Sequence, residues 1–464
     1  MRLTYEELNE LCKKFNTDRL WSWSRVNCPH NSLYEYFLKY IIKAKEDRLD
    51  SIYVNTGGMS HDALEKYYTK EIPYEKMIEE FEDGWSTAMI AELKFDRNDS
   101  TKNKSIQEKY YYDLQHFFKN HVSIKTKMIT EQFVTLKIGD EYFQGYIDAL
   151  TKDDDGNYHI LDWKTSSIYL GDKAKNECGQ LVMYAMALHQ KGIPYEKIKI
   201  AWDFLKYVNV YVEPPKKINL SWTTVKGEEK NKEKLDQSKL ISTIKASAKA
   251  WLKEVGYDKI QIEEIINQMV EKDDINTLPK EVRDKFIIEE INEEITPRHI
   301  ERCKIGESLQ ANVKAQMKKL GYDEDEVFSY LDMLIQTNNI SVLPEDVQSK
   351  YRFDDCFVYV DLTDELLKRW ENYIVDTVKM LREKEADYAK NKDETIWYED
   401  EESVKEQSYY FANLCGYSAK LHKPYKMYLD KLDAEKNGDI FGGTKKSEES
   451  DEYAEDDMSW LENL

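Results

Sequence analysis

Two short apolar runs in the middle of the chain carry two aspartates and a lysine. Gly145-Tyr-Ile-Asp148 precedes a polar turn, and Ile160-Leu-Asp162-Trp-Lys164 follows it. The turn, DDDGN, contains Gly and Asn, which accept the conformations of a hairpin loop, so we expect two paired strands. Asp162 and Lys164 are two positions apart and share one face of their strand. Two carboxylates beside a lysine could hold a divalent cation for phosphodiester hydrolysis, although such residues at strand ends are often only solvated.

Two predicted helices could add side chains to this group. Residues 177–188 have an amphipathic helical pattern that places Gln180 and Tyr184 on one face. This pair could hold a nucleic-acid phosphate or the lysine, or Tyr184 could pack in the core. Residues 57–68 are expected to begin another helix, and His61 lies in it. His61 could bind a metal through a neutral ring nitrogen, or it could be an ordinary packed or surface residue.

The order of these motifs resembles one family. The sequence contains GxxxHxxLE, a strand glutamate (Glu131), GYID, DWK and QxxxY, in that order. This series is similar to the RecB-type branch of the PD-(D/E)XK nuclease superfamily, in particular to phage-encoded exonucleases related to AddAB-type and CRISPR-adaptation nucleases. The resemblance covers about residues 20–210 and returns near 355–430. It implies an α/β fold with a restriction-endonuclease-like core, in which helices flank a central mixed β-sheet.

The resemblance also implies roles for individual residues. Mg²⁺ or Mn²⁺ would be bound by four groups: His61, Asp148, Asp162 and the backbone carbonyl of Trp163. Such hard cations suit oxygen ligands better than zinc does. Lys164 would orient the attacking water or stabilise the transition state, and Gln180 and Tyr184 would position Lys164 and DNA. Glu131 matches a less specific position of the family.

Cysteine usage departs from the family pattern. Many members carry an iron–sulfur cluster on four cysteines, one near the N-terminus and three near the C-terminus. Cys28 and Cys415 stand at expected places, but Leu421 stands about where the last cysteine would fall, and its neighbour is His422. An iron–sulfur cluster is therefore doubtful. One interpretation is a degenerate site that packs as core; the alternative is a zinc site of Cys28, Cys415, His422 and a fourth ligand such as His30.

Composition restricts the remaining classes of protein. The chain has 464 residues and six cysteines without a disulfide-like spacing, which is typical of a reducing compartment. The N-terminal sequence has no signal-peptide pattern, and no apolar run approaches 20 residues. We expect a cytoplasmic protein without a membrane partner, located in the bacterial host cytoplasm if it is phage-encoded. No phosphate-binding GxxxxGK[ST] motif occurs, which excludes an ATP-driven helicase within this chain.

A net charge of −22 would repel nucleic acid if it were evenly spread. Residues 101–127 are instead rich in lysines and aromatic rings. This stretch could hold a DNA strand, or it could be an amphipathic helix that packs its rings inward. The candidate DNA-binding residues are Lys102, Lys104, Lys109, Tyr111 and Lys119.

The middle of the chain contains an internal duplication. The same offset of 65 positions separates Gly256 from Gly321 and Pro279 from Pro344, together with their flanking sequences. Gly at a helix end and Leu-Pro before the next segment predict repeated helices. We therefore expect an all-helical duplicated module at 216–352, inserted into a core formed by 1–215 and 353–436.

The last residues, 437–464, are rich in Gly, Ser, Glu and Asp, which predicts a disordered acidic tail. Its end, DDMSWLENL, could dock on a replication or recombination protein, or it could mimic DNA and cover the catalytic groove. It could also serve only to solubilise the chain.

Together, these features predict a metal-dependent DNA nuclease. We expect an exonuclease that acts on linear ends, single strands or flaps in DNA recombination, repair or replication, encoded by a phage. An alternative is a DNA-end binding or recombination scaffold protein with a nuclease fold, which would bind DNA without a divalent cation and would not shorten it. A nuclease-fold regulator is a third hypothesis.

Overall fold

The structure is a computed structural model, and it describes residues 2–49, 51–212, 216–291 and 296–441. By its internal contacts the chain divides into two compact units. The first unit comprises Met1–Asn209, His299–Val342 and Asp354–Leu464, and the second comprises Val210–Arg298 and Leu343–Phe353. The predicted insertion at 216–352 is thus shared between the two units.

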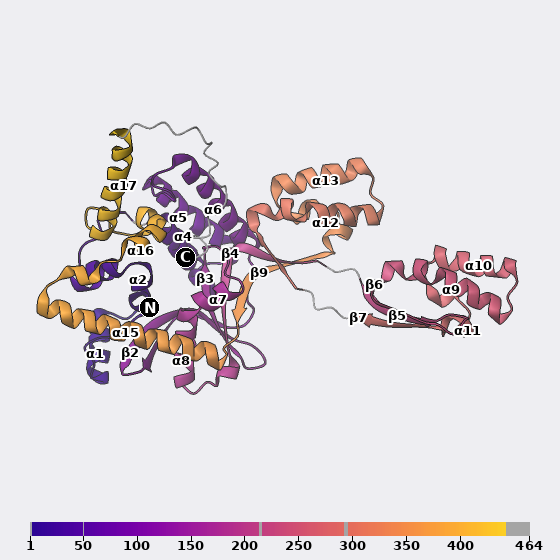
Figure 1. The fold of residues 1–464 in the computed structure, drawn as a ribbon, viewed down its shortest axis with the longest axis horizontal. Helices are drawn as coiled ribbons and strands as arrows, with labels where there is room; N and C mark the ends of the chain where they lie inside the picture. Colours follow the sequence, from indigo (N-terminus) through magenta and orange to yellow (C-terminus); the bar gives the residue numbers. More distant parts are fainter. Residues whose placement is uncertain (1, 50, 213–215, 292–295, 442–464) are drawn as a thin grey trace. The chain divides into compact units, whose positions relative to one another are not determined.

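A six-stranded mixed sheet organises the first unit (Figure 1). Its strands lie in the order β1-β2-β3-β4-β8, and β9 also pairs with β4. The strands are β1 (Met128–Ile138), β2 (Glu141–Lys152), β3 (Tyr158–Lys164), β4 (Ile198–Val212), β8 (Arg298–Glu301) and β9 (Tyr351–Val360). β1, β2 and β3 pair antiparallel, whereas β3 and β4 pair parallel. The mixed sheet expected from the sequence is therefore confirmed.

The predicted hairpin joins β2 to β3. Gly156 adopts a φ of +82°, and the amide of Asn157 donates to Asp153 Oδ1 at 2.8 Å. Ala149 pairs with Leu161 in the antiparallel register of the two strands. Asp148 and Asp162 are therefore the next two residues opposite each other. The turn chemistry thus sets which residues of the two strands face each other.

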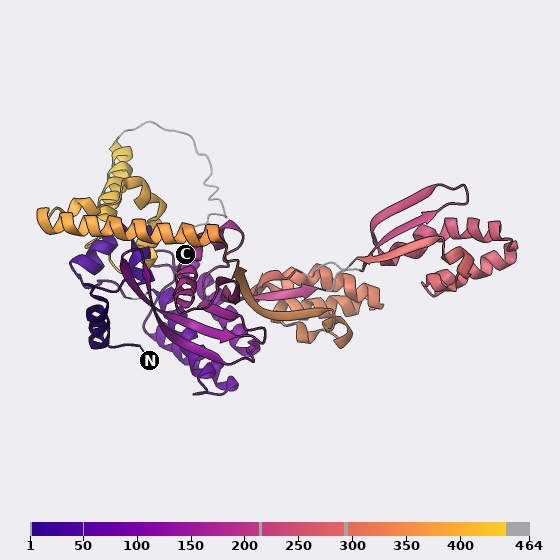
Figure 2. The same ribbon diagram turned by 90° about the horizontal axis from the view of Figure 1, so that it is seen from below.

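Helices cover both faces of the sheet (Figures 1 and 2). One face is covered by α4 (Ile52–Tyr68), α5 (Met77–Ile90) and α6 (Ser100–Asn120), and the other by α8 (Gly179–Gln190) and α15 (Asp364–Asn391). Alternate strand residues point to opposite faces, so Leu161 and Trp163 pack with α4 while Ile160 packs with α8. α7 (Asp172–Glu177) and α8 form the crossover from β3 to β4.

Terminal segments complete the first unit. They comprise α1 (Tyr5–Phe15), α2 (Trp23–Asn31), α3 (Leu33–Tyr36), the π-helix η1 (Phe37–Ile41), α16 (Glu401–Glu406), the π-helix η9 (Tyr410–Leu414) and α17 (Lys423–Phe441). Thr363 caps α15 by accepting from the Leu366 amide at 3.2 Å, as its sequence predicts. The predicted tail begins within α17, since that helix extends to Phe441, and the rest of it (442–464) lies outside the described residues.

The duplication is visible as two copies of one motif. The first copy contains β5 (Lys217–Thr223), β6 (Glu229–Asp236), the 3-10 helix η4 (Gln237–Lys239), α9 (Leu240–Val255), α10 (Lys259–Glu271), α11 (Lys280–Arg283) and β7 (Phe286–Ile291). The second contains β8, η6 (Arg302–Lys304), α12 (Ile305–Leu320), α13 (Glu324–Thr337), α14 (Glu345–Gln348) and β9. Gly256 and Gly321 both end their helices in the left-handed conformation, as predicted.

The module is not all-helical, however. The first copy has its own antiparallel sheet, in the order β6-β5-β7, and the second copy uses β8-β4-β9 in the same way. The second copy is therefore discontinuous, because its central strand, β4, precedes the first copy in the sequence. Strand β6 is the clearest miss: its sequence, EKNKEKLD, is almost entirely polar and exposed, so it lacks the apolar alternation from which strands are predicted.

No helix within the described residues is long and apolar enough to cross a membrane.

Candidate active site

The two aspartates and the lysine singled out in the sequence come together, with Asp148 inside β2 and with Asp162 and Lys164 near the end of β3. Asp162 is buried, and its Oδ2 lies 2.8 Å from Nζ of the partly buried Lys164. This ion pair confirms that the two side chains share one face of β3. Asp148 is close enough to Asp162 for the two carboxylates to affect each other's ionisation. Two acids and one cation are thus brought together by one hairpin.

The electrostatics of this group favour a bound cation. Burial and then the charge of Asp162 raise the pKa of Asp148 well above its usual range. Asp162 Oδ2 is buried and, apart from the ion pair with Lys164, accepts no well-directed hydrogen bond. Burial alone would lower the pKa of Lys164, but the charges of Asp162 and Asp148 outweigh it and raise that pKa. Two close carboxylates with spare lone pairs are a fitting site for a divalent cation.

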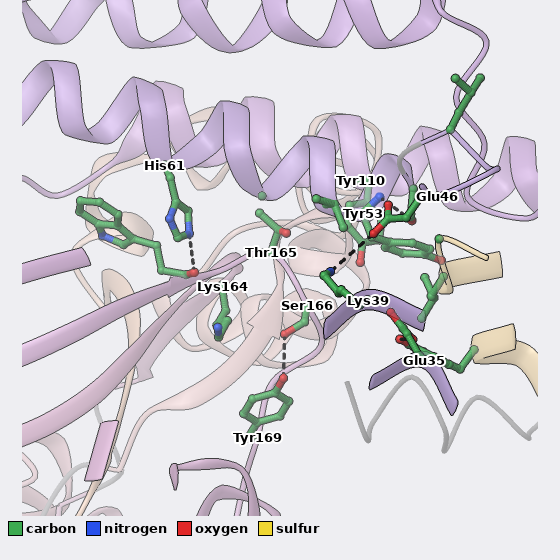
Figure 3. Close-up of a pocket in the computed structure, with 18 residues that line it drawn as sticks. Glu35, Lys39, Glu46, Tyr53, His61, Tyr110, Lys164, Thr165, Ser166 and Tyr169 are labelled. Carbon is green, nitrogen blue, oxygen red and sulfur yellow. Dashed lines mark hydrogen bonds and ion pairs between the residues drawn. The ribbon is translucent and has the colours of Figure 1, made fainter. Parts of the chain in front are cut away.

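His61 extends the site from helix α4. Its Nε2 donates to the backbone carbonyl of Trp163 at 2.8 Å (Figure 3). Its Nδ1 lies 3.6 Å from Asp148 Oδ2. Burial lowers the pKa of His61, so the neutral imidazole is favoured. The structure therefore brings together all four groups that the resemblance implied as metal ligands. Carboxylate and carbonyl oxygens with one imidazole are a donor set that suits Mg²⁺ or Mn²⁺.

Gln180 and Tyr184 lie one turn apart on α8, as predicted, and bond to each other. Gln180 Nε2 donates to the Tyr184 hydroxyl at 3.0 Å, and the ring of Tyr184 is buried. Tyr184 also lies close enough to Asp148 and Lys164 to interact with them electrostatically. A methyl group on Gly145 would come within 2.5 Å of the Tyr184 ring, which explains the glycine in the GYID motif. The tyrosine is therefore both a core residue and a wall of the site.

Glu131 lies at an irregularity in β1, opposite Asp148. The pairing runs from Thr130↔Ala149 to Gln132↔Ile147 and omits Glu131 and Asp148, and Glu131 has a φ of +49°. A left-handed conformation is unfavourable for glutamate and is often found at functional sites. Its carboxylate pairs with Arg2, whose Nε lies 3.1 Å from Oε2. Arg2 was not predicted from the sequence, because it is brought to the site from 129 positions away.

A cavity of about 540 Å³ lies beside His61 and Lys164 (Figure 3). His61 and Lys164 line it, and Glu35, Lys39, Tyr53 and Tyr410 line it elsewhere. Lys39 pairs with Glu46 at 3.5 Å, so the cavity wall carries charges of both signs. Lys39 and Tyr410 lie in the two π-helical turns, η1 and η9, a conformation often found near functional sites. Sequence reasoning did not place these residues at the site, since no local motif links them to it.

The candidate cysteine site does not have the arrangement of a metal centre. Cys28 Sγ donates to the Ser32 carbonyl at 3.9 Å, and Cys415 Sγ donates to Glu35 Oε2 at 3.6 Å. Both nitrogens of His422 are engaged: Nε2 lies 2.9 Å from Ser32 Oγ, and Nδ1 accepts from the Tyr425 amide at 3.3 Å. Burial raises the pKa of both thiols, which favours their protonated forms. These residues do not fit an iron–sulfur cluster, and they form buried hydrogen bonds instead.

The lysine-rich stretch forms α6, and its rings pack inward. Tyr110, Leu114, Phe117 and Phe118 are buried, and Tyr111 packs on Phe81 with ring centroids 6.1 Å apart. Tyr111 is thus partly buried beside core aromatic rings, which favours a packing role for it. The lysines have acidic or aromatic neighbours: Lys104 lies 3.8 Å from Glu108, and Lys102 lies 3.8 Å from Asp96 and 5.2 Å from the Tyr409 ring, whereas Lys109 and Lys119 are exposed.

Comparison with known proteins agrees with this geometry. No curated protein matches the sequence significantly. The family model of the PD-(D/E)XK nuclease superfamily matches residues 20–305, which is more than half of the chain and includes Asp148, Asp162 and Lys164. The chain therefore belongs to the PD-(D/E)XK nuclease superfamily.

Proposed function

We propose that this protein is a divalent-metal-dependent deoxyribonuclease that acts as an exonuclease on linear DNA ends, single strands or flaps. The observation that carries the proposal is the pair of close carboxylates, Asp148 and Asp162, beside the partly buried Lys164. The order of the motifs supports a phage-encoded enzyme of DNA recombination, repair or replication. The open cavity beside Lys164 offers room for a substrate strand next to the two carboxylates.

The metal site would be formed by Asp148, Asp162, His61 and the Trp163 carbonyl. When bound, Mg²⁺ or Mn²⁺ would supply Lewis-acid stabilisation of the phosphate charge and would lower the pKa of a water molecule. The two carboxylates would neutralise the cation, and because the pKa of Asp148 is raised, cation binding competes with protonation of that carboxyl group. His61 is favoured in its neutral form, which is the form that binds a metal.

Lys164 acts as a permanent cation in this proposal. Its raised pKa keeps the ammonium protonated at neutral pH, so it is poorly suited to accept a proton from water. Its position beside Asp162 allows it instead to stabilise the negative charge that develops on the phosphate in the transition state. Tyr184 and Gln180 hold the α8 wall against Gly145 and thereby keep the site narrow.

The test is cleavage of linear and closed circular DNA, single- and double-stranded, labelled at the 5′ or 3′ end. Wild type is compared with Asp162→Asn, Lys164→Ala and the control Lys199→Ala, whose side chain is exposed on β4. We expect shortening of linear DNA that requires Mg²⁺ or Mn²⁺, is abolished by EDTA, and is reduced at least about 100-fold in the two site variants but not in the control.

Cleavage of circles would contradict the exonuclease assignment but not the nuclease. An Asp162→Asn variant as active as wild type would refute the metal site. DNA binding that persists in EDTA without cleavage under any metal would favour the DNA-end binding or scaffold alternative.

A further inference from the structure

A second group of potential metal ligands lies apart from the aspartate–lysine site. Asp113 of α6, Glu301 at the end of β8 and Cys303 of η6 bring ligand atoms within 4.8 Å of one another. All three belong to the first unit, and α6 packs against η6. This site lies where the second copy of the duplicated motif contacts the core helix α6 (Figure 1).

The first copy provides an internal reference for this corner. At an offset of 65 positions, Asp236 corresponds to Glu301 and Ser238 to Cys303. In the first copy the corner is self-contained, because Asp236 Oδ1 accepts from the Ser238 amide at 2.9 Å and from its hydroxyl at 2.7 Å. The second copy thus has a glutamate and a cysteine at the two positions where, in the first copy, an aspartate accepts hydrogen bonds from a serine.

In the second copy, the cap comes from another helix. The Cys303 amide donates to Asp113 Oδ1 at 2.7 Å, and Glu301 makes no capping hydrogen bond of its own. Glu301 instead pairs with Lys304 at 2.9 Å. Asp113 therefore takes over the role that Asp236 plays in the first copy, which leaves the Glu301 carboxylate and the Cys303 thiol beside it.

Asp113 is incompletely satisfied in this position. Its side chain is fully buried, and Oδ2 has no hydrogen-bond partner. Within the described residues it forms no ion pair, although the charge of Lys206, whose ammonium lies 3.9 Å from the centroid of the Tyr110 ring, favours the ionised carboxylate. Burial and then the charge of Glu301 raise the pKa of Asp113 to about 7. A buried carboxylate oxygen without a partner is unfavourable unless the carboxyl group is protonated or bound to a cation.

We propose that Asp113, Glu301 and Cys303 form a second metal site, which binds a thiophilic divalent cation of the Zn²⁺ class and fastens the second copy to α6. A thiolate with two carboxylates suits Zn²⁺, Co²⁺ or Cd²⁺ rather than Mg²⁺. Binding replaces the proton of the Cys303 thiol with a metal–sulfur bond and releases that proton to solvent. The site shares no residue with the proposed nuclease site, whose four implied ligands include no cysteine.

The test uses Co²⁺ as a spectroscopic probe on the reduced full-length protein. Thiolate ligation of Co²⁺ gives a near-ultraviolet charge-transfer band, whereas the oxygen and imidazole ligands of the first site do not. We expect a band that saturates near one equivalent of Co²⁺ and is displaced by Zn²⁺. Cys303→Ser should abolish it without unfolding the corner, because the first copy carries serine at this position.

Matched variants locate the ion. Asp113→Asn should weaken Co²⁺ binding at least tenfold, whereas Cys28→Ser and Cys415→Ser should leave the band unchanged. Zn²⁺ should also protect Cys303 from alkylation by iodoacetamide, measured by mass spectrometry of the labelled peptide. The proposal is overturned if no band forms, or if the band survives Cys303→Ser and is lost in Cys28→Ser or Cys415→Ser.

Discussion

Replacing Gly145 with alanine should damage both stability and the catalytic geometry. The added methyl carbon would lie 2.5 Å from Cε1 of Tyr184 and 3.1 Å from its hydroxyl oxygen. Ordinary contact begins near 3.4 Å, so the ring or the strand must move by roughly 1 Å. The ring cannot swing away freely, because it is buried and its hydroxyl accepts a hydrogen bond from Gln180.

The magnitude follows from overpacking. An extra methyl in a well-packed core typically costs about 1–3 kcal/mol, and a displacement of about 1 Å near a catalytic group can lower the rate by about 100-fold. We therefore expect Gly145→Ala to lower the free energy of unfolding by about 2 kcal/mol, measured by urea denaturation, and to reduce the cleavage rate by about two orders of magnitude.

Two controls separate the steric effect from a general effect of substitution. Gly58 lies inside α4, and a methyl group there would meet no atom within 4 Å, so Gly58→Ala should be neutral or stabilising by up to about 1 kcal/mol. In a Tyr184→Ala background the penalty of Gly145→Ala should largely disappear. A Gly145→Ala protein as stable as wild type, or one whose penalty persists without the tyrosine ring, would refute the reasoning.

The remaining predictions concern the aspartate–lysine site and the group formed by Cys28, Cys415 and His422. Because the pKa of Asp148 is raised in the folded state, the metal-free protein should lose stability as pH rises from about 4 through that pKa. Asp148→Asn should flatten this dependence in thermal unfolding with EDTA, and an unchanged pH profile would contradict it. His61→Ala should raise the Mn²⁺ concentration needed for half-maximal cleavage about tenfold or more, whereas an unchanged requirement would exclude it as a ligand. Protein purified without oxygen should lack iron–sulfur absorbance, since Cys28, Cys415 and His422 are held in hydrogen bonds; iron and sulfide bound in stoichiometric amounts would contradict this.

Prediction from the sequence succeeded where the determinants are local. The strands around Asp148 and Asp162 are short apolar runs joined by the DDDGN turn, so the hairpin and the shared face of Asp162 and Lys164 could be predicted. The helix ends at Gly256 and Gly321 follow from the left-handed conformation that glycine accepts. The sequence around His61 left open a metal ligand or an ordinary packed or surface residue, and only the resemblance to the family favoured the ligand, since one histidine in a helix carries little information.

Other features depend on contacts that no local pattern encodes. Arg2 contacts Glu131 although the two residues are 129 positions apart in the sequence. The left-handed backbone conformation at Glu131 has no sequence signature. The polar strand β6 is held by pairing with β5 rather than by burial of its own side chains. The role of Asp113 became visible only when the two copies of the duplicated motif could be compared atom by atom.

The nesting of the two copies gives the first one the properties of a removable cassette. Lys217, at the start of β5, pairs with Ile291, at the end of β7, so the polypeptide enters and leaves this copy at adjacent backbone positions. The second copy cannot be excised in the same way, because β4, its central strand, also pairs with β3, the strand of Asp162 and Lys164. A single genetic event could therefore add or delete the first copy without breaking the sheet that carries Asp148 and Asp162. Deletion of the second copy would remove β4 from that sheet.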